Sequence, residues 1–285
     1  MEFGIALALV AALMTNLASL LKHRGCHRVE PIRIRQPLRS ARSLARSRWF
    51  AAGWGLAALA WLVHVAALSL APISLVQAVL AGGAVTVAVL SQRLFGDPVE
   101  RQQWLALLLG GSGLALLALT LPSLHGSDSA FSTAAILGFE GGLALLASGL
   151  ALGHRSSRLA ARSGVLLAAI AGILIALAGV AIKGLLGAGG VSLAVLGPWI
   201  ALTVVCGALA QYATVAALQK GQAVETIGLI GLVANATQIA GGVLVFGDPL
   251  AADPLGLVLQ ATAFAMVCGS ALLLPSRQVA RLAPA

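Results

Sequence analysis

One acidic residue stands near the middle of a long apolar run. Glu140 lies in the stretch ILGFEGGLALL and is followed by Gly141 and Gly142. A charged group inside a membrane span costs roughly 2.5–3.5 kcal/mol, so such a residue is a functional candidate by default. We expect its carboxyl to exchange protons or to bind a cation, with the two glycines leaving room for a substrate or another helix. The alternative is a protonated or paired Glu140 that only bonds across helices.

Neutral polar residues in other apolar runs are the next candidates. Asn235 and Gln238 are one helical turn apart, so they share a face of one helix. We expect this face to line a pathway together with Glu140. Each such group could instead be an interhelical hydrogen-bonding residue, a contact worth about 0.6 kcal/mol on average. The further candidates of this kind are His64, Gln77 and Asn16.

Two charged residues stand at the ends of apolar runs. Glu225 comes just inside the run 222–246, where the helix dipole favours an acid in the first turn. It could also gate a cytoplasmic vestibule. Lys183 ends the run 164–184, and its long side chain allows the ammonium group to reach the membrane surface.

The sequence gives little support for a metal site or an enzyme. His23, Cys26 and His27 stand close together in HRGCHRVE, which is a weak metal-binding pattern. The spacing of Cys26, Cys206 and Cys268 fits neither a disulfide framework nor a zinc site, so we expect small apolar fillers. No Ser-His-Asp order, paired catalytic carboxylates or phosphate loop is evident, and we expect no enzymatic activity and no cofactor.

The composition indicates a membrane protein. Hydrophobic residues make up 59% of the 285 residues and charged residues only 9%, and the mean hydropathy is +0.98. A soluble domain has roughly a quarter of its residues charged. The apolar runs are about 20 residues long, which is the length of a membrane-spanning helix. We therefore expect an all-α polytopic membrane protein, with the net charge of +9 reflecting topology and not a nucleic-acid partner.

Nine spans follow from the apolar runs. They are expected near 3–21, 49–70, 72–91, 103–121, 132–152, 164–184, 194–217, 222–246 and 254–274. With these spans, all but one of the 18 Lys and Arg residues fall on one side, the exception being Lys183. Because cytoplasmic loops collect Lys and Arg, we expect the N-terminus outside and the C-terminus in the cytoplasm.

The tetrapeptide FGDP occurs at 95–98 and again at 246–249. Five expected spans separate the copies, so the two turns face opposite sides. This predicts two inverted repeats: 1–121, with four helices and the basic cytoplasmic loop 22–48, and 132–274, with five helices, followed by a short cytoplasmic tail over 275–285. Inverted repeats are typical of secondary transporters that work by alternating access. The stretch QPLRSARSLARSRW in the basic loop is either an interfacial helix or a solvated loop that sets topology by charge.

The chain resembles the drug/metabolite transporter superfamily, whose EamA-type units are joined in inverted orientation. LFGDPVERQQWLALLLGGSG and VFGDPLAADPLGLVLQ carry the resemblance. The basic loop and SRWFAAGWGLAALAWLVHVAALSLAPISLVQAV are most similar to the NIPA-type magnesium transporter branch. Both turns have Asp-Pro where the family has Glu, so we expect only structural roles for Asp97, Pro98, Asp248 and Pro249.

The resemblance implies an inner-membrane (plasma-membrane) secondary transporter, with magnesium or another divalent cation as substrate. Small organic metabolites or drugs are the alternative substrates, and a non-transporting membrane scaffold is the alternative function. The expected partners are the lipid bilayer, a small solute or cation, and a second copy in a homodimer.

Overall fold

The computed structural model describes residues 2–32, 36–70, 84–96, 98–120, 133–154, 162–187, 193–246 and 250–274. All regular structure within these ranges is helical, which confirms the all-α expectation for the described part of the chain. The helices are α1 Glu2–Cys26, α2 Pro37–Arg46, α3 Arg48–Leu70, α5 Ala84–Leu90 with a π-helical turn Ser91–Phe95, α6 Arg101–Thr120, α7 Thr133–His154, α8 Ser163–Gly187, α9 Leu193–Lys220, α10 Ala223–Phe246 and α11 Pro254–Leu273.

Six of the described helices are long and apolar enough to cross a membrane, namely α1, α7, α8, α9, α10 and α11. They establish a polytopic membrane protein, as the composition predicts. The total of nine spans stays a prediction, since part of the expected third span lies outside the described residues.

Two helices end four or five residues later than expected. α1 continues to Cys26 and not to residue 21, so it takes up the first part of the expected basic loop. His23 and Arg24 lie in its last turn, where a positive charge interacts favourably with the helix dipole. These polar residues allow the last turn of α1 to extend beyond the apolar layer. The helix that contains α5 also continues past 91, through the π-helical turn to Phe95.

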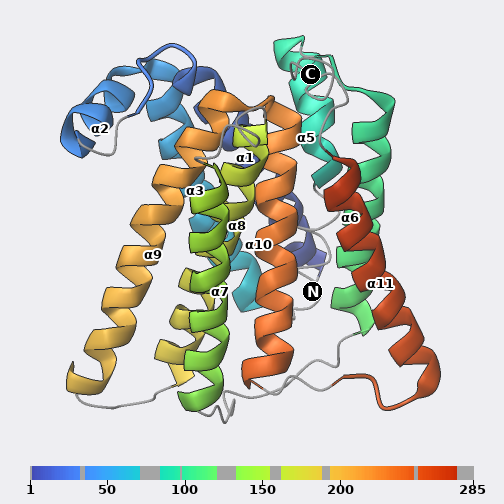
Figure 1. Cartoon of the computed structure of the whole chain (residues 1–285). Helices are drawn as coiled ribbons and strands as arrows, with labels where there is room; N and C mark the ends of the chain where they lie inside the picture. Colours follow the sequence, from blue (N-terminus) through green and yellow to red (C-terminus); the bar gives the residue numbers. More distant parts are fainter. Residues whose placement is uncertain are drawn as a thin grey trace.

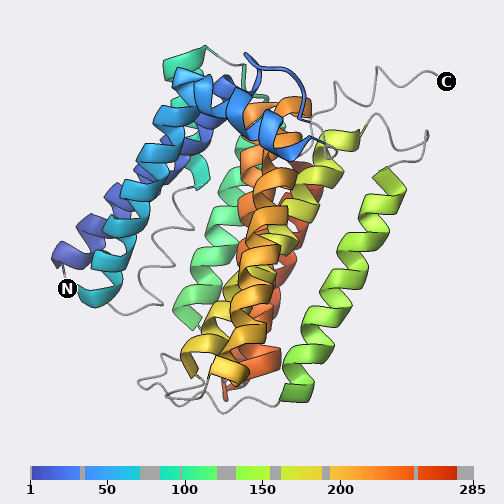
Figure 2. The same ribbon diagram turned by 90° about the vertical axis from the view of Figure 1, so that its left-hand side faces the viewer.

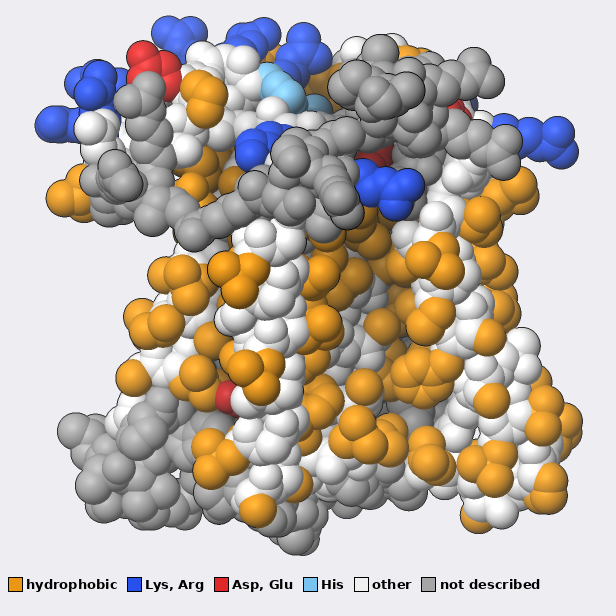
Figure 3. All heavy atoms as spheres, in the orientation of Figure 1, with side chains coloured by type: hydrophobic (Ala, Val, Ile, Leu, Met, Phe, Trp, Pro, Cys, Tyr) orange, Lys and Arg blue, Asp and Glu red, His pale blue; other side chains and the backbone are white. Residues whose placement is uncertain are grey.

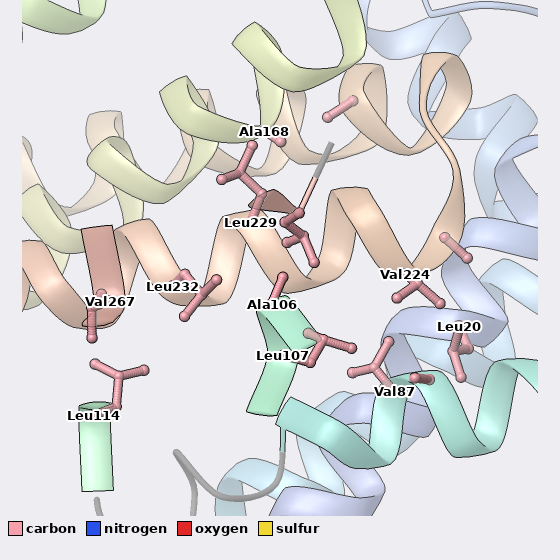
Figure 4. Packing of buried hydrophobic residues seen from close by; sticks show 14 of the residues in the cluster. Leu20, Val87, Ala106, Leu107, Leu114, Ala168, Val224, Leu229, Leu232 and Val267 are labelled. Atoms are coloured by element: carbon pink, nitrogen blue, oxygen red, sulfur yellow. The ribbon is translucent and has the colours of Figure 1, made fainter. Parts of the chain in front are cut away.

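The helices form a bundle in which α10 is central (Figures 1 and 2). It contacts α1, α5, α6, α7, α8, α9 and α11. Elsewhere α1 packs along α3, α8 along α9, and α6 along α11. Figure 2 shows α7 at the edge of the bundle, where it packs mainly on α8. The cluster of buried apolar residues joins α10 to its neighbours through Leu20, Leu107, Leu114 and Leu232 (Figure 4).

Glycines allow close helix contacts on one side of this bundle and not on the other. A Cβ at Gly172 of α8 would lie 2.7 Å from Val233 Cβ in α10, and one at Gly113 of α6 would lie 2.9 Å from the Ala263 carbonyl oxygen in α11. Small residues of this kind let helix backbones approach in membranes. In α7, by contrast, Gly138, Gly141, Gly142 and Gly149 would place a Cβ in open space.

Glutamine side chains fix both ends of the α6–α11 pair. At the start of α6, the Gln102 amide donates to the carbonyl oxygen of Leu273, the last residue of α11, over 2.7 Å. At the start of α11, the Gln260 amide donates to the carbonyl oxygen of Thr120, the last residue of α6, over 3.1 Å. The two helices are therefore antiparallel, and each is bonded at its C-terminal end by the other.

Lys and Arg side chains gather at one end of the bundle in the view of Figure 3. Helix α2 lies across this end (Figures 1 and 2). Its Leu44 is buried in a cluster with Cys26, Phe50 and Leu218, which attaches the helix to α1, α3 and α9. The sequence left a helix and a loop as alternatives here, and the structure has a helix over Pro37–Arg46.

Candidate functional site

Glu140 lies on α7 on the side that faces the bundle. Its side chain is only 6% exposed, and Oε1 has no hydrogen-bond partner among the described residues. The Glu140 carboxyl lies close enough to Cys206 of α9 for the two groups to interact electrostatically. An unsatisfied polar atom in an apolar span is costly, so Glu140 is the first candidate for a functional group in this part of the molecule.

Thr203 of α9 carries a second buried polar atom, and the sequence provided no expectation for this residue. Its Oγ1 is buried without a hydrogen-bond partner in the described part of the chain. Thr203 precedes Cys206 by three residues, so the two side chains share a face of α9. Glu140 and Cys206 thus form a small polar group between α7 and α9, and Thr203 lies on the same face of α9 as Cys206. The spacing of Thr203 and Cys206 in TVVC was only a weak signal that they share a buried face. An apolar run does not show how a helix is rotated about its axis.

The other face of interest is on α10. Asn235 and Gln238 are both half-buried there. Gln238 lies against α8, because a Cβ at Gly179 would be 3.0 Å from Gln238 Oε1. No hydrogen bond within the described residues joins this face to Glu140, whose neighbours in α9 were named above. Phe139, the residue before Glu140, is the one that meets α10: a Cβ at Gly241 would lie 3.1 Å from Phe139 Cε1.

Two candidates of the first half lie apart from this group. Asn16 Nδ2 of α1 donates a 2.6 Å hydrogen bond to Thr86 Oγ1 of α5, which joins two helices of that half. His64 is half-buried on α3, and its Nδ1 has no partner among the described residues.

Several candidates lie at the basic end of the bundle. Glu225 is buried in the first turn of α10. His23 Nε2 lies 3.1 Å from the Gly221 carbonyl oxygen, and His27 Nε2 lies 3.2 Å from His23 Nε2. The described residues contain no group of three or more His, Cys, Asp or Glu side chains arranged to hold a metal ion. The cysteines are free: Cys26 and Cys206 are buried, whereas Cys268 is exposed on α11.

The two FGDP turns are described only in part. In the first, Gly96 adopts a left-handed conformation with φ of 69°, which ends the helix, and its N–H donates to the Gln92 carbonyl oxygen over 3.2 Å. Pro98 follows and is exposed. Gln77, Asp97, Asp248 and Pro249 lie outside the described residues, as does the side chain of Lys183.

Comparison with known proteins gives no family for this chain. No family model, no curated protein and no solved structure matches it.

Proposed function

We propose that this chain is a secondary membrane transporter that works by alternating access, with Glu140 as the group that takes up and releases a proton or a cation during transport. The proposal places the N-terminus outside and the basic end, with α2, in the cytoplasm, because Lys and Arg collect on the cytoplasmic side. It also places the protein in the inner membrane.

The packing of helices supports an inverted repeat. We match α1 with α8, α3 with α9, α5 with α10 and α6 with α11, leaving α7 without a counterpart. α1 packs along α3 as α8 packs along α9, α1 contacts α5 as α8 contacts α10, and α5 contacts α6 as α10 contacts α11. The ends of α5 and α10 that lead into the two FGDP turns lie at opposite ends of the bundle (Figure 1).

The reciprocal bonds of α6 and α11 are the observation on which the proposal mainly rests. Each helix has 20 residues, and each receives a glutamine amide bond on its last carbonyl from the first turns of the other. A pseudo-two-fold axis in the membrane plane relates such contacts. Two halves related in this way can exchange conformations, so an outward-open state has an inward-open counterpart of similar energy.

The residues around Glu140 bear on what is carried. Mg²⁺ prefers several oxygen ligands, and the group between α7 and α9 offers one carboxyl and one thiol. This set favours proton exchange by Glu140, coupled to the movement of a small organic solute, over a dedicated Mg²⁺ site. Magnesium transport, which the sequence resemblance implies, remains the competing proposal for the substrate.

Flux into proteoliposomes tests these proposals. We expect a proton gradient to drive uptake of a member of a metabolite panel, and Glu140→Gln to abolish that uptake at unchanged protein incorporation. Glu100→Gln is the matched control, because it removes a carboxyl from a half-buried site at the start of α6 and should leave uptake intact.

Three other results would change the conclusion. Uptake of ²⁸Mg²⁺ that Glu140→Gln abolishes would replace the organic solute with magnesium. Full uptake by Glu140→Gln would remove Glu140 from the mechanism. Absence of uptake for every metabolite and cation would favour a non-transporting scaffold.

A further inference from the structure

A cavity of about 1130 Å³ lies at the basic end of the molecule, away from Glu140. Its walls are α2, the start of α3 and the segment that follows α1. Five arginines line it, namely Arg28, Arg39, Arg42, Arg46 and Arg48. Glu30 is the one acid among the lining residues. The cavity is therefore strongly positive.

The arginines of α2 reach the cavity because of their spacing. Arg39, Arg42 and Arg46 follow one another at intervals of three and four residues, which places them on one face of the helix. Leu44 is buried against α1, α3 and α9, so the rotation of α2 about its axis is fixed by apolar packing. Leu38, in contrast, is 85% exposed. An amphipathic helix of this kind, with arginines and an exposed leucine, is suited to the surface layer of a membrane.

Aromatic contacts hold guanidinium groups on a ring that lines the cavity. The Arg28 Cζ lies 5.5 Å from the centroid of the Trp49 ring, which itself lines the cavity. The Arg24 Cζ lies 5.2 Å from the same ring. Stacking on an aromatic face holds a guanidinium in place while leaving its N–H groups free to bind an anion. Two positive groups held near one ring repel each other, and an anion between them would relieve that repulsion.

The lining arginines are not used in ion pairs. Within the described ranges no carboxylate lies within salt-bridge distance of any of the five. The cavity thus has many guanidinium N–H donors and, among its described lining residues, a single carboxylate, that of Glu30. Ser43, from the middle of α2, adds a hydroxyl to the lining.

We propose that this cavity binds a phosphate-bearing anion, taken either from the headgroup of an anionic phospholipid or from a soluble phosphate compound. The planar guanidinium fork matches the oxygens of a phosphate group and binds two of them at once, which a lysine ammonium cannot do. The proposal does not depend on the transport function, since none of the residues around Glu140 takes part. A phosphate site of this kind requires arginine, whereas a basic loop that only determines membrane topology does not, because lysine and arginine are equally effective in the positive-inside rule.

The test uses the purified full chain and a charge-preserving variant. Arg39→Lys, Arg42→Lys and Arg46→Lys are combined in one protein. The matched control combines Arg93→Lys, Arg101→Lys and Arg162→Lys, which are exposed residues outside the cavity lining. Native mass spectrometry measures the affinity for dioleoyl phosphatidylglycerol, with phosphatidylcholine as the neutral lipid. Calorimetry in detergent measures binding of inorganic phosphate and pyrophosphate. A thermal unfolding profile and gel filtration check that each protein is folded.

We expect the cavity variant to bind its anion about tenfold more weakly than the wild type, and the control to bind as the wild type does. Binding of phosphatidylglycerol without binding of phosphate or pyrophosphate identifies a lipid headgroup as the ligand. Binding of phosphate or pyrophosphate without binding of phosphatidylglycerol identifies a soluble phosphate compound. Equal affinities of the cavity variant and the wild type would overturn the proposal, as would absence of binding in both measurements. If the combined variant is unfolded, Arg42→Lys alone is compared with Arg101→Lys by the same criteria.

Discussion

The two ends of the α6–α11 pair make the same bonds with different residues. At the start of α11, Gln260 does two things: its Oε1 accepts the Ala251 N–H over 3.2 Å and its Nε2 donates to Thr120. At the start of α6 the two tasks are divided, since Gln103 Oε1 accepts the Glu100 N–H over 3.1 Å while Gln102 donates to Leu273.

The positions of the accepted N–H groups show how close the correspondence is. Glu100 is five residues after Phe95, and Ala251 is five residues after Phe246. The same backbone N–H after each FGDP turn is therefore bonded by a buried glutamine. One difference follows from the divided arrangement: Gln103 is 1% exposed and its Nε2 has no partner among the described residues. The two halves therefore share the same hydrogen bonds, although the residues that make these bonds stand at different positions.

The largest effect should come from Gln260→Leu. This change removes both bonds at one end and leaves the Ala251 N–H and the Thr120 carbonyl without their partner. At about 1 kcal/mol for each bond, with a further cost for unsatisfied groups, we expect the free energy of unfolding to fall by about 2–3 kcal/mol. Equilibrium unfolding in mixed detergent micelles measures it. A loss below that of Gln103→Leu would mean that the Gln260 bonds do not hold the pair together.

A smaller effect is expected for Gln103→Leu. The variant loses the bond to Glu100 N–H, but it also removes a buried amide nitrogen that has no partner, and these two changes oppose each other. We expect a loss of about 1 kcal/mol in the same unfolding measurement. Gln103→Glu serves as the control for the accepted bond, since its carboxylate can still accept the Glu100 N–H as a helix-capping residue.

The smallest effect is expected for Gln102→Ala, at about 0.5–1 kcal/mol, because this side chain is only half-buried and its bond to Leu273 lies near the end of the bundle. Combining Gln102→Ala with Gln103→Leu should approach the loss of Gln260→Leu alone. A combined loss that stays near 0.5 kcal/mol would show that the two ends are not equivalent in energy.

Composition and apolar run length were sufficient to predict the helical class and most helix positions. The predicted end of α1 was wrong by five residues, because basic residues that end an apolar run do not necessarily end the helix. The burial of Glu140 was predictable from its isolation in an apolar run, but its proximity to Cys206 of α9 was not. Which helix a residue faces depends on rotation, and nearly uniform apolar runs carry no periodic signal of rotation.

The hydrogen bonds of the glutamine side chains could not be predicted from the sequence either. Gln103 follows Phe95 by eight residues, whereas Gln260 follows Phe246 by fourteen. Two of the six extra residues precede α11, whose N-cap Asp253 accepts the Gly256 N–H over 2.8 Å, and the other four place Gln260 one helical turn further along its helix. An alignment of the two copies therefore places these glutamines at different positions, and only the fold brings them to the same N–H group.

The open packing of α7 bears on how Glu140 could move during the proposed transport cycle. Neighbouring residues of an α-helix differ by about 100° around its axis. Turning α7 by that angle would put Glu140 where Phe139 now meets Gly241, one turn from Gln238 on α10. Because four α7 glycines have open space in front of them, such a turn meets little steric resistance there. A single swivelling helix would then carry a carboxyl from the face of α9 to the centre of the bundle.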